Sequence, residues 1–302
     1  MTAAKRLEPL DIKDAPARPF CKWAGGKTQL LAELRKRMPH KFGRYHEPFV
    51  GGGALLFSLA DSLPGRLSPW QRPKTGHWAT INDANPLLIA TYRAICVDVE
   101  GVIERLHDLQ NEYRTSKGGE KVFYRVRDRG PGDKPAAIAA YVIFLNKTCF
   151  NGLWRVNRKG LFNVPHGKRP GQVVICDQDN LRRVSQVLQH CSINCGDFEV
   201  AAENAKRGDF VYFDPPYVPR SADSDFTAYT KEPFGPAEQE RLRDVVGRLK
   251  RRGVKVMLSN ADVPYVRKLY KGGGFTIDRV SALRAINSKA DRRGPVGEVI
   301  IT

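Results

Sequence analysis

The chain has 302 residues, of which 41% are hydrophobic, so it can bury the core of one large α/β domain or of one domain interrupted by a smaller one. No run approaches the ~18 apolar residues of a membrane span, and the start MTAAKRLEPL lacks the apolar core of a signal peptide, so we expect a cytoplasmic protein without membrane contact. A net charge of +18 and a pI near 9.8 favour a polyanionic partner.

The first 83 residues combine helix and strand patterns with one long loop. Apolar spacing over 28–38 predicts a helix, and RYHEPFVGGGALLFSLA (44–60) predicts a strand, a glycine turn and a second helix. Residues 62–79 hold three prolines and two glycines without periodicity and predict a loop, and ATIND (79–83) predicts a short strand. The loop either contacts nucleic acid or is a surface loop without function; its basic residues are Arg66, Arg72 and Lys74.

Residues 86 to about 145 show a helical pattern without a strong strand signal, including a buried helix at PAAIAAYVIFLN (135–146). Beyond them, apolar runs and amphipathic stretches alternate, which predicts an α/β sheet domain split by a largely helical insertion. The predicted strands are QVVIC (172–176), CSINCGDF (191–198), FVYF (210–213), VKVMLS (254–259), FTIDRV (275–280) and EVIIT (298–302). The apolar helix positions between them are Leu181, Val184, Leu188 and Cys191, then Leu242, Val245, Val246 and Leu249.

A basic segment runs from Lys147 to Arg169 and contains no acidic residue. Three aromatic residues, Phe150, Trp154 and Phe162, lie within it. A run of this kind is either a solvated face or a nucleic-acid contact, and the interleaved aromatic residues favour the contact. The six cysteines include no C-x-x-C pair, so the sequence predicts reduced thiols rather than a zinc site or disulfides.

The stretch KWAGGKT (22–28) ends like the phosphate-binding loop of ATP-binding proteins. That loop requires G-x-x-x-x-G-K-[ST], because its first glycine allows the turn that aims backbone N–H groups at the phosphates. Here Cys21 occupies the position of the first glycine. The motif is therefore incomplete, and this stretch must have another role.

A second glycine-rich turn follows the first predicted strand and reads F-x-G-x-G, with Phe49, Gly51 and Gly53. Such a turn lets a ligand approach the backbone at the carboxyl edge of a parallel sheet. Asp83, at the end of the next strand, can accept hydrogen bonds from both hydroxyls of a ribose. The pair indicates a nucleoside-bearing cofactor, although a structural turn and a solvated aspartate would look the same.

The residues Asp214, Pro215, Pro216 and Tyr217 follow the apolar run FVYF directly, which places them at the same edge of the sheet. Two prolines fix the backbone and supply no N–H, so the Asp214 carboxylate and the Pro215 carbonyl can face one point. Two fixed acceptors suit an exocyclic amino group, because accepting both hydrogens favours a pyramidal nitrogen whose lone pair can attack. Tyr217 adds an aromatic face on which a base can stack. A rigid turn is the alternative for this motif alone.

Six motifs, in order, resemble the Dam-like, alpha-class (D12 type) DNA adenine-N6 methyltransferases: FCKWAGGKTQLL, EPFVGGGALLF, FNGLWRVNRKGLFNVPHGKR, DPPY, DFTAY and LSNAD. The resemblance covers most of residues 19–302 and implies a Rossmann-like sheet with an inserted, mainly helical target-recognition domain that carries a β-hairpin. The implied organisation is a lead over 1–18, a catalytic domain in two parts, 19–91 and 173–302, and a recognition domain over 92–172. It also implies S-adenosylmethionine as the cofactor and no metal.

The resemblance assigns roles to residues at the predicted cofactor site. Trp23 and Lys27 would contact S-adenosylmethionine, with Lys27 on the methionine carboxylate. Asp83 would hold the ribose, and Asp197 with Phe198 would border the adenine. The backbone from Phe49 through Gly51 to Gly53 would pass under the methionyl part, and Asp214 would lie between the cofactor and the target base.

The resemblance also implies a DNA-binding surface. Lys22 matches a family position that reaches DNA, and Asn151, Leu153 and Arg155 match the base-reading turn. Arg155 can donate a bidentate pair to guanine. The family's usual GATC site is nevertheless in doubt, because this chain departs from the family pattern at Lys147, His166 and the Lys168–Arg169 pair. Arg158 and Lys159, which lead into the hairpin, are expected to face phosphates. Lys168 and Arg169 are the alternative base-reading residues if Arg155 only anchors phosphate.

The predicted function is methyl transfer from S-adenosylmethionine to N6 of an adenine flipped out of duplex DNA, by a site-specific enzyme encoded by a bacterium or phage and acting on host DNA. Methylation of cytosine N4 or of an RNA base is the enzymatic alternative, since two acceptors fit any exocyclic amine. A DNA-binding module without catalysis would keep the basic segment but not an intact Asp-Pro-Pro-Tyr loop. A restriction endonuclease is a possible partner, and a monomer or weak dimer is expected.

Overall fold

The structure is a computed structural model that describes residues 16–23, 25–60, 76–116, 119–157, 159–167, 173–218, 234–283 and 295–302. The loop predicted over 62–79 lies outside these ranges up to residue 75, together with Arg66, Arg72 and Lys74. No helix in the described ranges has the length and apolar character needed to cross a membrane.

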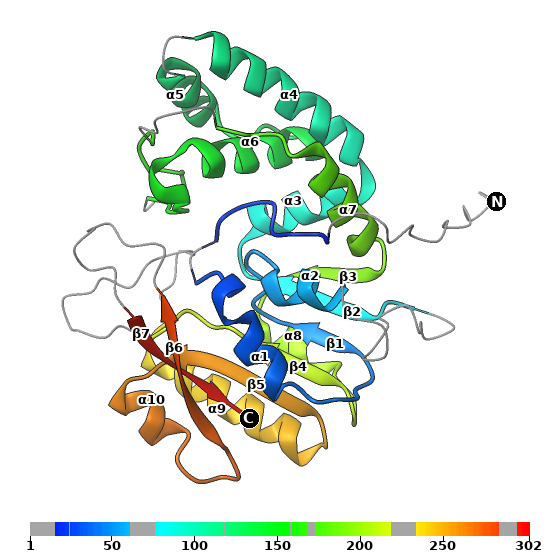
Figure 1. The fold of residues 1–302 in the computed structure, drawn as a ribbon, viewed down its shortest axis with the longest axis vertical. Coiled ribbons are helices and arrows are strands. Elements are labelled where there is room, and N and C mark those ends of the chain that lie inside the picture. Colours follow the sequence, from blue (N-terminus) through cyan, green and yellow to red (C-terminus); the bar gives the residue numbers. More distant parts are fainter. Residues whose placement is uncertain are drawn as a thin grey trace.

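A seven-stranded sheet with the order β3-β2-β1-β4-β5-β7-β6 forms the centre of the molecule (Figure 1). The first five strands of that order pair in parallel, and β7 runs antiparallel to both β5 and β6. After β1 the chain adds β2 and β3 on one side of the sheet, and after β4 it adds β5, β6 and β7 on the other side. The β1/β4 boundary is therefore a switch point, where such sheets leave a crevice at the carboxyl ends of the strands. The strands are β1 Tyr45–Glu47, β2 Ala79–Asp83, β3 Cys191–Cys195, β4 Phe210–Phe213, β5 Lys255–Ala261, β6 Ile277–Leu283 and β7 Pro295–Ile301.

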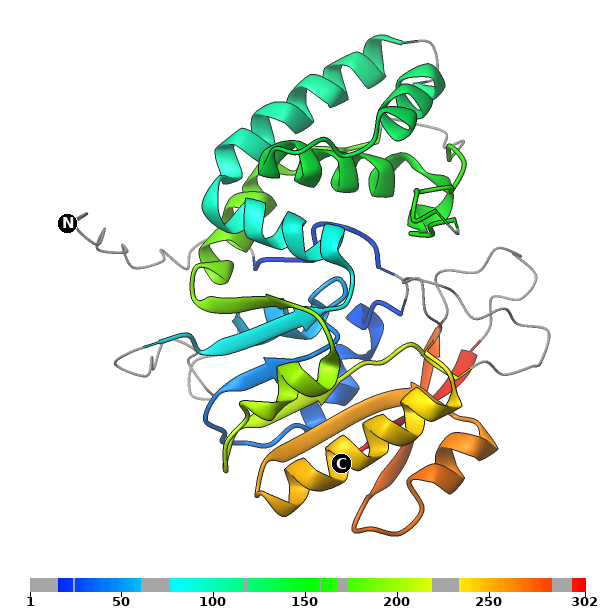
Figure 2. The same cartoon turned by 180° about the vertical axis from the view of Figure 1, so that it is seen from behind.

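Helices cover both faces of the sheet. The front face in Figure 1 carries α1 and α2, and the view from behind in Figure 2 shows α8 and α9 on the other face. The α9 helix begins with proline at its first turn and turns the predicted apolar stripe, Leu242, Val245, Val246 and Leu249, into the core. These elements are α1 Leu31–Arg37, preceded by the 3₁₀ turn Thr28–Leu30, α2 Ala54–Ala60, α8 Phe198–Glu203, α9 Pro236–Arg251 and α10 Pro264–Leu269.

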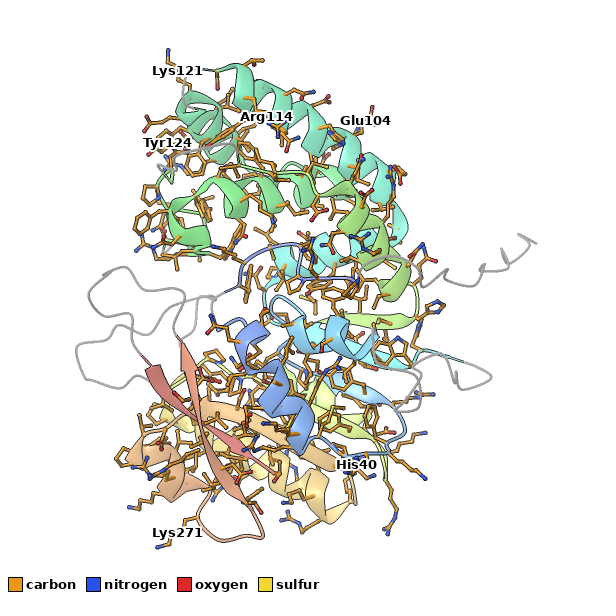
Figure 3. The ribbon with its side chains drawn as sticks, viewed as in Figure 1. His40, Glu104, Arg114, Lys121, Tyr124 and Lys271 are labelled. Atoms are coloured by element: carbon orange, nitrogen blue, oxygen red, sulfur yellow. The ribbon has the colours of Figure 1, made fainter. Side chains whose placement is uncertain are left out.

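A layer of helices lies beyond the β3 edge of the sheet (Figure 1). Its members are α3 Pro86–Val97, α4 Val99–Thr115, α5 Glu120–Arg129, α6 Pro135–Thr148 and α7 Gln178–Leu188. The α3 helix begins sharply because Asn85 accepts hydrogen bonds from two N–H groups of its first turn and Pro86 follows. The outer side of the layer carries polar residues such as Glu104, Arg114 and Lys121, at the opposite end of the molecule from His40 and Lys271 (Figure 3).

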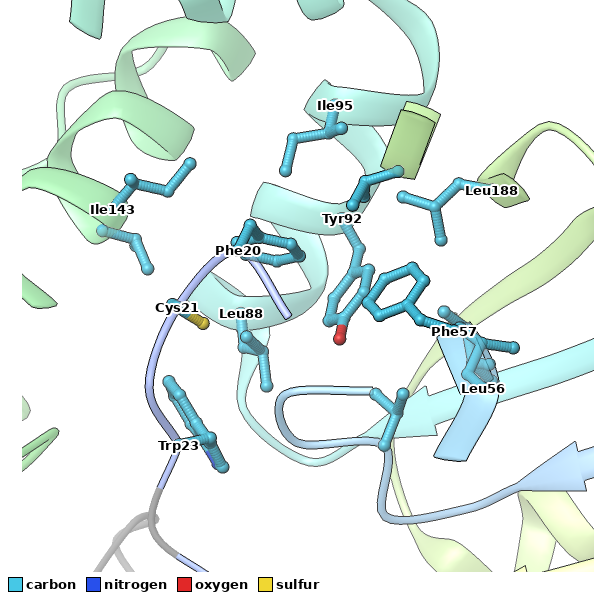
Figure 4. Close-up of a cluster of buried hydrophobic side chains, with 14 of the residues drawn as sticks. Phe20, Cys21, Trp23, Leu56, Phe57, Leu88, Tyr92, Ile95, Ile143 and Leu188 are labelled. Atoms are coloured by element: carbon cyan, nitrogen blue, oxygen red, sulfur yellow. The ribbon is translucent and has the colours of Figure 1, made fainter. Parts of the chain in front are cut away.

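One hydrophobic core joins this layer to the sheet. Phe20 packs edge-on against Tyr92 of α3, with ring centroids 4.9 Å apart, and lies near Phe57 of α2 and Ile143 of α6 in the close-up (Figure 4). Phe20, Cys21 and Trp23 of the segment before α1 are thus buried between the sheet and the helical layer. The proposed boundary at residues 91–92 falls within the continuous helix α3.

The described elements confirm most of the predicted order, with two corrections. Residues 173–176 of QVVIC form no strand; the N–H groups of Ile175 and Cys176 instead donate to the Gln110 side-chain oxygen, at 2.9 and 3.2 Å. The Gln110 side chain of α4 therefore accepts the two backbone N–H groups that would pair with a neighbouring strand if this segment were part of the sheet. Cys191, expected on the apolar face of a helix, is the first residue of β3, because α7 ends at Leu188.

The basic segment after α6 has little regular structure in its described part. It contains a 3₁₀ turn at Phe150–Gly152 and two isolated antiparallel bridges, Val156 with Phe162 and Cys149 with His166. The Asn157 N–H donates to the Leu161 carbonyl at 2.8 Å and closes a short turn between the paired positions. The β-hairpin and the separate recognition domain remain predictions.

Candidate active site

Four chain segments meet at the carboxyl edge of the sheet, where β1, β2, β3 and β4 end. The Asn82 side-chain amide joins two of them, because its Nδ2 donates to the Pro48 carbonyl at 3.0 Å and to the Gly196 carbonyl at 2.9 Å. The Gly196 N–H in turn donates to the Asp83 carbonyl at 3.2 Å. The predicted glycine turn, Asp83 and the start of α8 are therefore held next to one another.

The glycine turn after β1 needs its glycines for two physical reasons. Gly51 and Gly53 have φ of +47° and +71°, in the left-handed region that side chains disfavour. A Cβ on Gly51 would lie 2.9 Å from the Trp23 ring, and one on Gly53 would lie 2.8 Å from the Tyr92 hydroxyl oxygen. The turn is a backbone surface packed directly against the KWAGGKT segment, as a shared ligand site requires.

Asp83 ends β2 with its carboxylate against this turn. Its Oδ2 accepts the Gly51 N–H at 3.1 Å, and its Oδ1 accepts the Asn85 N–H at 2.9 Å. Burial raises the pKa of Asp83 to about 6, although these two N–H groups oppose the rise. A carboxylate offers about four acceptor positions, so Asp83 can also accept from ligand hydroxyls.

An aromatic patch lies at the ends of β1 and β3. The rings of Phe49 and Phe198 stack with centroids 5.2 Å apart, and Phe234 meets Phe49 edge-on at 5.6 Å. Arg241 of α9 lies over the Phe198 ring, 4.3 Å from its centroid, and its Nη2 reaches Asp197 Oδ2 at 2.5 Å. Asp197 also caps α8 by accepting the Glu199 N–H. Phe198 is buried and already contacts Phe49 and Arg241, so the partly exposed Phe49 ring, beside the polar Asp197, is the part of the patch that suits a purine.

Asp214 follows β4 and points to a buried cation. Lys27 Nζ lies 2.8 Å from Asp214 Oδ1, and only 5% of the Lys27 side chain is exposed. The same ammonium donates to the Gly25 carbonyl and lies 4.6 Å from the centroid of the Tyr217 ring. Burial raises the pKa of Asp214 above its ordinary value, while Lys27 and Ser259 favour the ionised form. Lys27, predicted to bind the cofactor, is thus also the counter-ion of the carboxylate.

The Asp-Pro-Pro-Tyr loop is held rigidly by neighbouring side chains. Gln239 of α9 donates to the Pro216 carbonyl at 2.9 Å and accepts from Asn260 of β5 at 3.0 Å. The Tyr217 hydroxyl donates to Glu298 Oε2 of β7 at 2.7 Å, which fixes the ring orientation. Pro215 is buried between these anchored residues.

The predicted base-reading turn lies against the KWAGGKT segment. The Asn146 side chain of α6 accepts the Lys22 N–H at 2.8 Å and donates to the Lys22 carbonyl at 2.7 Å and to the Gly152 carbonyl at 3.1 Å. Trp23 stacks on Trp154, with ring centroids 5.9 Å apart. One side-chain amide therefore ties the cofactor-site segment to the turn.

The predicted DNA-binding residues differ in exposure. Asn151 adopts a left-handed conformation with φ of 56°, and Leu153 packs partly against the core. Arg155 is exposed, and its Nε donates to Asn163 Oδ1 at 2.9 Å across the bridged pair. Lys22 and Lys159 are exposed as well. Arg158, Lys168 and Arg169 lie outside the described residues.

Comparison with known proteins identifies the family. The description D12 class N6 adenine-specific DNA methyltransferase matches residues 23–286. The chain belongs to this family. It is 41% identical to the type II methyltransferase M.MjaIII of Methanocaldococcus jannaschii, over 91% of this chain and 95% of that protein. It is 41% identical to the type II methyltransferase M1.LlaDCHI of Lactococcus lactis, over 94% and 95%. It is 32% identical to the DNA adenine methylase of Haemophilus influenzae, over 94% and 92%.

The geometry of the candidate site adds three residues that the sequence did not single out. Ser259 donates to Asp214, Glu298 accepts from Tyr217, and Asn146 joins Lys22 to Gly152. The polar pair Ser259–Asn260 directly follows the run VKVML and belongs to the motif LSNAD, which is the signal that points to the first of them. Pairing partners such as Glu298 carry no local signal in the sequence.

Proposed function

We propose that this adenine-specific DNA methyltransferase uses S-adenosylmethionine and methylates N6 of an adenine flipped out of duplex DNA. The observation that carries this proposal is the position of Asp214. It follows β4 directly and lies across the sheet switch point from the glycine turn of β1. That arrangement sets a carboxylate acceptor beside a nucleoside-shaped site.

The residues at the crevice fit S-adenosylmethionine by their chemistry. Asp83 supplies acceptor oxygens for the ribose hydroxyls, and the patch of Phe49 and Phe198, bordered by Asp197, suits the adenine. The turn from Phe49 to Gly53, against Trp23, supplies a close backbone surface for the methionyl part, and Lys27 supplies a cation for its carboxylate. Bound S-adenosylmethionine would supply an electrophilic methyl group.

Asp214 would act on the substrate amine. Its carboxylate accepts one N–H of the amino group and the Pro215 carbonyl accepts the other, which concentrates the lone pair on the nitrogen. When the nitrogen gains the methyl group it must lose one proton, and the Asp214 carboxylate is placed to hold it. Tyr217, fixed by Glu298, offers a ring on which the flipped base stacks. Because the chain belongs to the adenine-N6 family, cytosine N4 and RNA bases are disfavoured as targets.

The DNA surface in this proposal comprises the base-reading turn and its basic neighbours. Asn151, Leu153 and Arg155 read bases, and Lys22 reaches the DNA from the cofactor side. Phosphate contacts come from Arg158 and Lys159, and Lys168 and Arg169 belong to the same DNA-binding surface. The recognition domain would span 92–172 between catalytic parts at 19–91 and 173–302. A cognate restriction endonuclease and a monomeric or weakly dimeric state also belong to the proposal.

The identity of the cofactor can be tested by thermal stability. Any ligand bound only by the folded state stabilises it, by about 2.7 kcal/mol at a concentration of 100 times Kd. We expect S-adenosylmethionine and its demethylated product to raise the melting temperature, and ATP to leave it unchanged because the phosphate loop is incomplete. Stabilisation by ATP alone would contradict the assignment of residues 22–28.

The pH dependence of cofactor binding tests the role of Asp83. Its pKa of about 6 means that the carboxyl is neutral at lower pH and ionised above it. The neutral form has lost its charge and one acceptor, so affinity should weaken as the pH falls below 6, by up to about tenfold per pH unit. Calorimetric titration with the demethylated product from pH 5 to 8 measures this. The Asp83→Asn variant should bind the demethylated product weakly, with an affinity that does not depend on pH. If its affinity showed the same pH dependence as the wild type, the assigned role of Asp83 would be ruled out.

A further inference from the structure

Asp214 is held by a chain of hydrogen bonds that begins inside the sheet. Ser259 of β5 donates through Oγ to Asp214 Oδ1 at 2.8 Å, and the hydroxyl of Tyr212 on β4 lies 2.9 Å from the same Oγ. Ser259 is fully buried and Tyr212 is 1% exposed. A buried hydroxyl cannot hydrogen-bond to bulk water, so the direction of the Ser259 O–H is fixed by Asp214 on one side and Tyr212 on the other.

Asp214 has three hydrogen-bonding neighbours, Lys27, Ser259 and Tyr217, and the first two share one oxygen. Lys27 Nζ and Ser259 Oγ each lie 2.8 Å from Oδ1. The two oxygens of Asp214 are therefore inequivalent: Lys27 and Ser259 both hold Oδ1, and we assign Oδ2 to the target amine. Anchoring one oxygen with two donors fixes the rotation of the carboxylate, which an attack on a methyl group within a narrow range of angles requires.

We propose that Ser259 is a positioning residue for methyl transfer: its hydroxyl, oriented by Tyr212, holds Asp214 Oδ1 so that Oδ2 accepts the N–H of the target amine. This inference rests on the proposed function, in which Asp214 meets that amine. Ser259 touches neither substrate nor cofactor in this scheme, and it acts through the carboxylate alone.

The hydroxyl also affects the charge of the carboxylate. A donor to Oδ1 favours the ionised form, so its removal should raise the pKa of Asp214 further above the ordinary value. The other ionisable groups that face Asp214 stay in place in a Ser259 variant. They are Lys27 before the first helix, Tyr45 and Glu47 on β1, Tyr212 on β4, and Tyr217 with its partner Glu298.

The test compares Ser259→Ala and Tyr212→Phe with the wild type and with Ser185→Ala, which removes a buried serine hydroxyl of α7 away from the site. Single-turnover methylation is measured from pH 5 to 9 with saturating S-adenosylmethionine and DNA. A hydrogen bond to a charged group predicts a rate about 10- to 100-fold lower for Ser259→Ala. The acid limb of its profile should move to higher pH. Tyr212→Phe should shift both in the same direction by less, and Ser185→Ala should shift neither.

The outcomes separate the inference from the function on which it rests. A wild-type rate and acid limb in Ser259→Ala would overturn the inference. So would a slower rate with an unmoved acid limb, because that result describes a structural serine. If Ser259→Ala does not fold, Tyr212→Phe decides by the same two readouts. In each case Asp214→Ala must be inactive; an active Asp214→Ala would instead refute the proposed role of Asp214 itself.

Discussion

Replacing Asp214 with alanine should abolish methyl transfer, with a loss of at least about 10²–10³-fold, the scale found when one preorganised electrostatic contact is removed from a reacting centre. The substitution removes one of two acceptors aimed at the amine and the group that holds its proton. The loss of its counter-ion from buried Lys27 should lower the stability. We expect the fold to persist, because Lys27 keeps the Gly25 carbonyl and the Tyr217 ring as partners. Single-turnover assays with saturating cofactor and DNA measure the effect.

Asp214→Asn is the matched variant for this experiment. It keeps the size of the side chain and one acceptor oxygen but loses the charge, so its activity should also be severely impaired. Melting curves and affinity for the demethylated cofactor show whether either variant is misfolded. Residual activity within tenfold of the wild type would place the carboxylate away from the reacting nitrogen.

Replacing Arg155 with alanine should reduce discrimination at one base position of the recognition site, by about 1–3 kcal/mol. Arg155 is exposed, and its Nε bond to Asn163 holds the guanidinium. A bidentate pair with guanine would use the two terminal nitrogens. Methylation rates on a panel of single-base variants measure the loss. Asn163→Ala, which frees the guanidinium without removing it, should give a smaller loss at the same position.

The control for Arg155 is a variant that loses positive charges predicted to contact phosphates and keeps the predicted base-reading residues. Arg158→Ala combined with Lys159→Ala should weaken binding to cognate and unrelated duplexes alike, and should flatten the salt dependence by about one unit of slope per lost contact. Equal losses on every base variant for Arg155→Ala would show that Arg155 only anchors phosphate and that the sequence is read elsewhere.

Much of the fold was predictable because buried parallel strands and amphipathic helices leave strong local patterns. The run FVYF is buried at every position, and Asp214 directly after it had to lie at the sheet edge. Residues 173–176 of QVVIC have the same apolar character, yet these described residues form no strand. Its backbone partner is the Gln110 side chain, and an apolar pattern does not reveal which group will satisfy a backbone N–H.

The candidate site was predictable as a set of residue types, and its pairings were not. Asp83, Asp214 and the glycine turn follow strands whose carboxyl ends must meet at one edge. The ion pair between Lys27 and Asp214 joins residues far apart in the chain, and Lys27 alone suggested an anionic ligand rather than a protein carboxylate. Glu298 reaches Tyr217 only because β7 inserts antiparallel beside β5, a topology that the alternating pattern does not specify.

The Asn146 amide hydrogen-bonds to Lys22 on one side and to Gly152 on the other. It therefore connects the predicted base-reading turn to the segment of the candidate active site. In the proposed function, a base that fits badly at Asn151–Arg155 would displace the turn, and we expect the displacement to pass through this amide to the segment that ends at Lys27, the counter-ion of Asp214. Thermodynamic linkage makes such a coupling reciprocal. A ligand bound to this segment should therefore also raise the affinity of the turn for its correct DNA sequence. We therefore expect fidelity to be expressed more in turnover than in affinity: wrong sites are bound and then left unmodified.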